Sequence, residues 1–248
     1  MPHLAAQKIN NWLIYSSSNV QTKPALDVHT AQEALAALED DGRGLFYSSV
    51  VTLVDALRGI VRGHFSWATV KLYYSAFYSV RSILCMNNVA LFYPPTGKPY
   101  SLRCEPGQKA VKEHGVTHKV VWNILKRELP SSPLHGVIVA DEAHVWMKKL
   151  REDANYKTPK FPDPTVPAHF SSLDSIGVGR ALHGYVDDQS MLYAFDPDHA
   201  AIAFPIECLR RAHVAVARTG NVMDEQDAAH IAACLAEMNL DPAIFDFN

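Results

Sequence analysis

Apolar and aromatic residues recur at three- and four-residue steps between residues 66 and 88, whose sequence is SWATVKLYYSAFYSVRSILCMNN. The repeating positions are Trp67, Val70, Tyr73, Tyr74, Phe77, Val80, Arg81 and Leu84. Because an α-helix turns every 3.6 residues, this spacing predicts a helix with a broad aromatic stripe on one face. Ser66 is a residue type that caps helix N-termini, and Asn87-Asn88 supplies a polar stop.

The segments before this helix predict two more. Residues 45–62 place apolar side chains on one face, and Gly63 ends the segment just before the aromatic helix. We therefore expect these two helices to pack as an antiparallel hairpin. A helix over residues 30–39 opens with a capping box at Thr30, and the run DDGRG at 40–44 is expected to break it.

The rest of the chain alternates helical periodicity with proline-rich connections. Residues 89–116 and residues 157–167 each contain four prolines, which argues for two long irregular loops. The predicted helices around and after these loops cover residues 117–129, 137–156, 171–186, 199–218 and 224–238. Strand-like pieces are short, and the best lie near residues 191–195 and 201–206. We therefore expect an all-α protein.

Composition and charge indicate an ordinary soluble globular protein. The chain has 248 residues, 48% of them apolar, and a formal net charge of −3, which excludes a globally basic nucleic-acid binder but not a local basic patch. The four cysteines form no C-x-x-C pair and no signal peptide precedes them, so we expect reduced thiols and a cytoplasmic location. No stretch reaches the about 20 apolar residues of a membrane helix, so no membrane contact is expected.

Three short motifs, in this order along the chain, carry a family resemblance. They are the run YYSAFY at 73–78 with Arg81, the pair His118-Lys119 at the start of an apolar helix, and the run REDANY at 151–156. With this order and spacing, residues from about 45 to 158 resemble the HEPN superfamily of prokaryotic helical bundles. The resemblance implies an antiparallel helical bundle over 45–158, with helical extensions over 1–44 and 159–248.

The resemblance implies one of two functional outcomes. Many HEPN proteins are metal-independent RNases that act as dimers in toxin–antitoxin or antiviral modules, and others have lost the chemistry and serve as binding scaffolds. The nuclease version carries an arginine and a histidine late in the bundle. The histidine would move a proton at the 2′-hydroxyl or the leaving oxygen, and the arginine would stabilise charge at the phosphoryl centre. Because the 2′-hydroxyl is the nucleophile, such a site cuts RNA and not DNA.

In this chain Tyr156 stands where that histidine is expected. The pKa of an unperturbed tyrosine lies about three units above that of histidine, so tyrosine is a poor base near neutrality. The structural alternative for this segment is Arg151 paired with an acidic neighbour and a tyrosine ring packed at the helix end.

The leading hypothesis is therefore an accessory protein of a prokaryotic defence or toxin–antitoxin type module, with a degenerate nuclease motif. It would bind a nucleotide, RNA or a protein partner. The first alternative is an active RNase whose site, shared across a dimer, uses Arg151, Tyr156 and His118. The second alternative is a structural interaction subunit in which the proline-rich segments 89–116 and 157–167 dock a partner.

Basic residues indicate where an anion or a nucleic acid would bind. Lys119, Lys126 and Arg127 lie with Trp122 in a locally basic run over 109–127, as in grooves that hold RNA or single strands. The alternative is a solvated helix face with Trp122 in the core. We expect a homodimer, with RNA, a nucleotide or a protein from the same module as a further partner.

No metal ion or cofactor is expected. His114 and His118 are four residues apart, but Gly115 places His114 in a loop before the helix, so the pair lacks the geometry of two ligands on one helix face. The sequence also lacks a glycine-rich phosphate loop after a strand. Arg58 and His64 share the arginine–histidine interval, but they lie at the end of an early helix.

Overall fold

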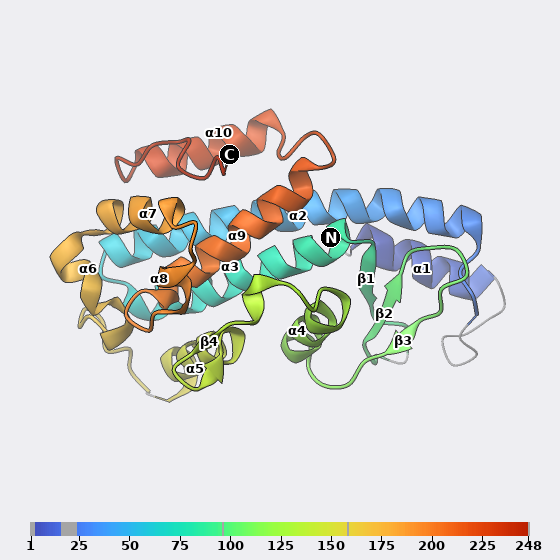
Figure 1. Ribbon diagram of the computed structural model, residues 1–248, viewed down its shortest axis with the longest axis horizontal. Coiled ribbons are helices and arrows are strands. Elements are labelled where there is room, and N and C mark those ends of the chain that lie inside the picture. Colours follow the sequence, from blue (N-terminus) through green and yellow to red (C-terminus); the bar gives the residue numbers. More distant parts are fainter. Residues whose placement is uncertain (1–2, 16–23, 96, 158, 248) are drawn as a thin grey trace.

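Three long helices form the centre of the protein. The computed structural model describes residues 3–15, 24–95, 97–157 and 159–247 (Figure 1). Helices α2 (Val28–Val61), α3 (Phe65–Met86) and α9 (Ala200–Ala217) pack together, with the most extensive contact between α2 and α3. The described chain is predominantly helical, in agreement with the all-α prediction. A bundle arrangement of HEPN type stays a prediction.

The predicted hairpin of two antiparallel helices is confirmed. Residues 62–64 connect α2 to α3, and Gly63 takes a left-handed φ of +76°, which glycine adopts without strain. Between the two helices, the buried Ser49 hydroxyl donates to the carbonyl oxygen of Ser75 at 2.9 Å and lies 2.6 Å from the Ser79 hydroxyl. These small, mutually bonded side chains let the two backbones approach closely without leaving polar groups unpaired.

The predicted break at residues 40–44 is wrong, because α2 continues through it. The unusual residues there serve tertiary contacts instead. Gly42 is buried against α3, where an added Cβ would clash with Met86 Cε, and its carbonyl oxygen accepts a 2.8 Å hydrogen bond from the Ser82 hydroxyl. Asp41 accepts from the backbone amides of Leu4 and Ala5 at 2.9 and 3.0 Å, which caps helix α1 (Leu4–Tyr15).

Two helix caps also differ from their predictions. Helix α2 starts at Val28, because Asp27 caps it by accepting from the Thr30 amide at 2.8 Å. Ser66 lies inside α3 and does not cap it. Its backbone amide donates to Asp163 Oδ1 at 3.0 Å, so a carboxylate distant in sequence satisfies this end of the helix.

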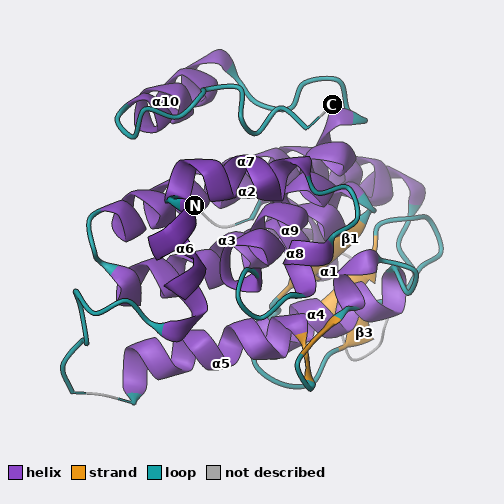
Figure 2. Ribbon diagram, turned by 60° about the vertical axis from the view of Figure 1, so that its left-hand side comes forward, coloured by secondary structure: helices purple, strands orange, loops and turns teal. Residues whose placement is uncertain are grey.

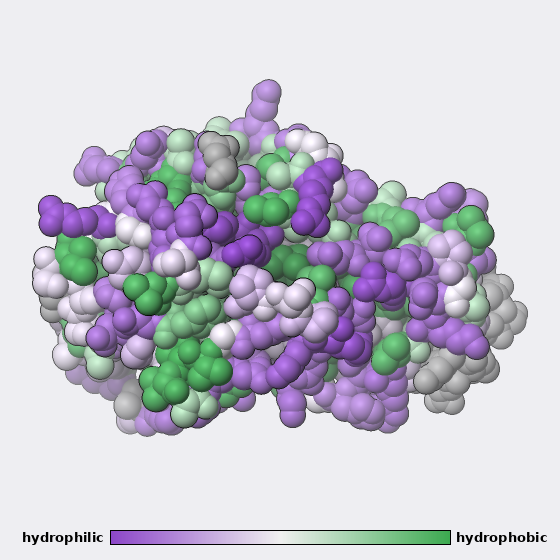
Figure 3. All heavy atoms as spheres, viewed as in Figure 1, coloured by the Kyte–Doolittle hydropathy of each residue, from purple (hydrophilic) through white to green (hydrophobic). Residues whose placement is uncertain are grey.

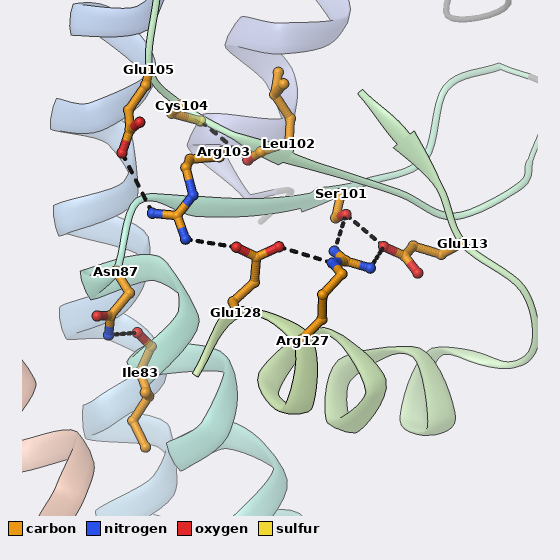
Figure 4. Close-up of polar contacts among 10 residues, drawn as sticks. All are labelled: Ile83, Asn87, Ser101, Leu102, Arg103, Cys104, Glu105, Glu113, Arg127 and Glu128. Carbon is orange, nitrogen blue, oxygen red and sulfur yellow. Dashed lines mark hydrogen bonds and ion pairs between the residues drawn. The ribbon is translucent and has the colours of Figure 1, made fainter. Parts of the chain in front are cut away.

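The predicted polar stop of α3 is confirmed, since Asn87 Nδ2 donates to the Ile83 carbonyl oxygen at 2.7 Å (Figure 4). Most of the predicted aromatic face is buried, including Tyr73, Phe77 and Leu84. Trp67, in the first turn of the helix, was predicted in this face but is 51% exposed.

The segment 89–116, predicted as irregular, contains a small antiparallel sheet. Its strands are β1 (Val89–Phe92), β2 (Tyr100–Arg103) and β3 (Val111–Lys112), in the order β1-β2-β3. Val89 pairs with Arg103, and Phe92 pairs with Tyr100. The sheet, α1 and the first half of α2 enclose a second apolar core at one end of the molecule (Figure 1).

The helix predicted over 117–129 is confirmed as α4 (Thr117–Glu128), but the helix predicted over 137–156 starts later than expected. Two short strands, β4 (Val137–Ile138) and β5 (Asp141–Glu142), form a hairpin before α5 (Ala143–Tyr156). On the face shown in Figure 3, apolar side chains gather where Figure 1 places this hairpin, and Val137 and Val139 are exposed there. Residues 159–167 contain no helix or strand, as predicted for that loop.

The C-terminal part adds helices to the same core. Gly177 divides the helix predicted over 171–186 into α6 (Ser171–Ile176) and α7 (Val178–Asp187). Both strand signals are wrong: residues 191–195 contain the short helix α8 (Leu192–Phe195), and residues 201–206 lie inside α9. The helices predicted near 199–218 and 224–238 are confirmed as α9 and α10 (Glu225–Ala236). Figures 1 and 2 both place α10 at the edge of the molecule, where it contacts α2.

One continuous apolar core joins residues of the predicted bundle with residues of the predicted C-terminal extension, because α9 packs against both α2 and α3. The other predicted boundary, at 44/45, falls inside α2.

Among the described residues, α2 alone is long and apolar enough to cross a membrane by length and composition, which the sequence prediction did not foresee. Half of the residues in its most apolar stretch are buried inside the fold. The cytoplasmic location stays a prediction.

Candidate functional site

A pocket of about 330 Å³ lies between α4 and α5, with Tyr73 of α3 among its lining residues. Hereafter it is called the α4–α5 pocket. Helix α4 contributes His118, Lys119, Trp122, Asn123 and Lys126, and α5 contributes His144, Val145 and Lys148. The volume lies within the range of about 300–1,000 Å³ that is typical of small-molecule sites.

Helical periodicity explains why these side chains converge. His118 and Trp122 are four residues apart on α4, and His144, Lys148 and Arg151 follow one another by four and three residues on α5. Each set therefore lies on one face of its helix. The buried residues of α4 beside Trp122 are Val120, Val121, Ile124 and Leu125, which fix the helix against the core.

Arg151 is a buried cation that does not line the pocket itself but lies against its lining residue Tyr73. The residue is only 8% exposed, and its guanidinium lies 4.7 Å from the centroid of the Tyr73 ring. Its ion pair with Glu152 is long, at 3.4 Å, and Glu152 also pairs with Lys148 at 3.2 Å. Arg151 Nε is buried and has no hydrogen-bond partner among the described residues. One shared carboxylate therefore balances two cations, and the local charge is positive.

His118 belongs to the same aromatic cluster. Its ring centroid is 4.6 Å from that of Phe77, 5.5 Å from that of Tyr73 and 5.6 Å from that of Tyr74. Burial lowers the pKa of His118, and the positive charges of Arg151 and nearby residues lower it further. The imidazole is therefore neutral at pH 7, and its buried Nδ1 has no hydrogen-bond partner among the described residues.

The other end of the pocket is formed by a stacked pair. The rings of His144 and Trp122 are nearly parallel, with centroids 4.8 Å apart. Burial lowers the pKa of His144 to about 4, although the Glu142 carboxylate 3.5 Å away opposes this shift. Glu142 also binds Lys126 at 2.8 Å, so this rim is close to neutral, whereas the end near Lys148 is cationic.

The structure brings some predicted site residues together and separates others. His118 and Arg151 both lie against the ring of Tyr73, and Lys119 lines the pocket with an exposed side chain. Lys126 lies at the rim in its ion pair with Glu142. Tyr156 is 77% exposed at the C-terminal end of α5 and does not line the pocket.

Arg127, predicted to contact nucleic acid, points away from the pocket. Its guanidinium donates at 2.9 Å to Glu113, Ser101 and Glu128, so it joins α4 to the small sheet (Figure 4). Glu128 in turn accepts from Arg103 at 2.6 Å. Glu113 is buried, and this network therefore supplies the partners that a buried carboxylate needs.

The sequence reasoning missed His144 and Lys148, which lie four residues apart in the helix that also carries Arg151. The four-residue spacing of these two side chains on the helix of Arg151 could have indicated them.

Arg58 and His64 do not form a joint site. Arg58 pairs with Glu237 at 3.1 Å, and His64 is the cap residue of α3. Within the described parts of the chain, no group of three or more His, Cys, Asp or Glu side chains is placed to hold a metal ion.

Comparisons of this chain with protein-family models, with curated protein sequences and with solved structures gave no match. The resemblance to the HEPN superfamily therefore stays a prediction.

Proposed function

We propose that the α4–α5 pocket binds a phosphate-bearing ligand, either a nucleotide or RNA, and that the chain is a HEPN-like accessory protein of a prokaryotic defence or toxin–antitoxin type module. The observation that carries the ligand proposal is the buried, incompletely paired Arg151, which has Lys148 one turn away on the same helix face. A buried guanidinium without a full set of acceptors is stabilised by an anion.

The other residues of the pocket suit the same ligand. Lys119 and Lys148 provide cations near the mouth. The partly exposed ring of His144, stacked on the buried Trp122, provides an aromatic surface against which a nucleobase can pack. Among the described lining residues, Glu142 is the one carboxylate, and Lys126 neutralises it. An anionic and partly aromatic ligand therefore meets complementary charge and shape.

Calorimetric titration with GMP, and separately with a short single-stranded RNA, tests this proposal. We expect saturable binding that weakens as salt rises, because phosphate contacts release counterions. Lys119→Glu and Lys148→Met should each weaken binding by about tenfold, the effect of losing one charge-assisted contact. Lys98→Glu is the matched control, since Lys98 is an exposed lysine in the connection between β1 and β2 and does not line the pocket.

The two ligands distinguish the two forms of the proposal. Binding of GMP favours a nucleotide site, and binding of RNA without GMP favours an RNA site. Absence of binding by both at low salt would contradict the proposal. An equal loss in Lys98→Glu and Lys119→Glu would also contradict it, because the attraction would then be diffuse.

A second candidate function is metal-independent RNA cleavage. The observation that favours it is that a neutral histidine, His118, and a cation, Arg151, both lie against the ring of Tyr73. His118 would take the proton of the 2′-hydroxyl while Arg151 stabilises the phosphoryl oxygens. Incubation of RNA with the protein in EDTA should then give cyclic-phosphate ends, and His118→Ala should abolish them. Tyr156→Phe should have no effect, because Tyr156 is outside the pocket. Intact RNA at high protein concentration would exclude this candidate.

A further inference from the structure

A second cavity, of about 210 Å³, lies between the start of α3, the end of α5 and the loop that precedes α6. Hereafter it is called the α3–α5 cavity. Its apolar wall consists mainly of Phe65, Leu150, Ala154, Pro162 and Pro167. This volume is below the range typical of drug-sized ligands, so its occupant has to be a small molecule with an apolar body.

Thr69 and His169, two of the polar residues that line this cavity beside Ser66 and Asp153, present no free donor to a ligand. The Thr69 hydroxyl has one proton, which it donates to the Phe65 carbonyl oxygen at 2.9 Å. His169 Nε2 lies 2.9 Å from the same hydroxyl oxygen and therefore carries the proton of that hydrogen bond. Burial lowers the pKa of His169 to about 4, so the ring is neutral at pH 7 and Nδ1 remains as an acceptor.

The cavity also carries negative charge. Asp153 lines it, and the described lining residues include no lysine or arginine. The ion partner of Asp153 is Lys157, whose side chain is 70% exposed and forms an i,i+4 pair with it at 2.5 Å. Exposed pairs of this kind contribute little stability, so a better-placed cation can replace the lysine. Asp163, next to the lining residue Pro162, adds a second carboxylate nearby.

We propose that the α3–α5 cavity binds a small organic amine, with its apolar body against Leu150, Ala154 and the prolines and its ammonium group on Asp153. An ammonium group carries three N–H donors and no acceptor, which matches a carboxylate and the imidazole of His169. A carboxylate-bearing ligand of the same shape meets two acceptors and a like charge. This inference is independent of the function proposed for the α4–α5 pocket.

Isothermal calorimetry on the full chain tests the proposal with three probes of one shape: phenethylamine, 2-phenylethanol and phenylacetate. We expect saturable binding of phenethylamine, binding of 2-phenylethanol weaker by about tenfold, and no binding of phenylacetate. Asp153→Asn should weaken phenethylamine binding by about tenfold and leave 2-phenylethanol binding unchanged. Ala154→Phe, which fills the cavity, should abolish the binding of both.

Asp141→Asn is the matched control, because Asp141 pairs with the exposed Lys149 at 2.6 Å and does not line the cavity. Phenethylamine should bind this variant as it binds the wild type. The proposal is overturned if phenethylamine shows no saturable binding, if phenylacetate binds equally well, or if Asp153→Asn leaves phenethylamine affinity unchanged. The Asp153 side chain is 47% exposed, so Asp153→Asn should leave the fold intact and this last comparison stays decisive even where Ala154→Phe disturbs folding.

Discussion

Phe77→Ala tests whether the aromatic face of α3 forms part of the core. Phe77 is 4% exposed, and its ring lies within 6.5 Å of the rings of Tyr73, Tyr74, Tyr78 and His118. Full burial of a phenylalanine side chain contributes about 1.5–3 kcal/mol, and aromatic pairs add about 0.5–1.5 kcal/mol each. With the cavity left behind, the expected loss of unfolding free energy is about 3–5 kcal/mol.

Urea denaturation followed by circular dichroism measures this loss, and for a chain of this size it corresponds to a fall of about 6–20 °C in Tm. Tyr156→Ala is the control, because that ring is 77% exposed at the end of α5. Its substitution should change stability by no more than about 0.5 kcal/mol. A loss of less than about 1 kcal/mol in Phe77→Ala would refute the reasoning, since the face would then not be packed.

Three further predictions concern stability. Asp41→Ala should cost about 0.5–2 kcal/mol in urea denaturation, because it removes the cap of α1, and unchanged stability would show that α1 needs no cap. Arg127→Met should lower the free energy of unfolding by about 1–3 kcal/mol, because it leaves the buried Glu113 without its arginine partner. The same variant should not weaken nucleotide binding; weaker binding with unchanged stability would place Arg127 in the site. His144 and His169 have pKa values of about 4 in the folded protein against 6.5 for free histidine, so the unfolded chain takes up protons first. Stability should therefore be complete above pH 6.5 and fall towards pH 4, and a urea midpoint equal at pH 7 and pH 5 in the wild type would contradict this.

Elements with strong helical periodicity were predictable from the sequence. Helix α4 buries five residues (Val120, Val121, Trp122, Ile124 and Leu125) and begins at Thr117, as its pattern indicates. Helices α9 and α10 also match their predicted ranges closely, although their patterns are weaker and residues 201–206 within α9 carry a strand signal. Local pattern suffices in these elements because apolar spacing and chain breaks point to the same boundaries.

Elements that depend on distant contacts were not predictable. The run at 40–44 has the composition of a turn, but Gly42 is needed for the close approach of α3 and Asp41 for the cap of α1. The small sheet in 89–116 has strands of two to four residues, too short for alternation to stand out among four prolines. In these segments tertiary contacts override local preference.

The candidate site was predictable in part. His118 and Arg151 were named because of the family resemblance, and the fold places them around one aromatic ring. Arg127 could not be separated from Lys119 and Lys126 by sequence, because all three are basic residues of one helix. The buried Glu113 that holds Arg127 lies 14 residues earlier, and only the fold brings the two together.

The burial of Arg151 limits how two copies of this chain could share a site. A site that used Arg151 from both copies of a dimer would bring the two Arg151 side chains towards each other. Here, however, the guanidinium is packed over Tyr73 and only 8% of the residue is exposed. A second copy would have to open the contact between α5 and α3 to reach it. Lys119, by contrast, is exposed at the pocket lining. If the predicted homodimer shares an anionic ligand, the ligand therefore meets the partner through the lysines, while Arg151 acts from within its own chain.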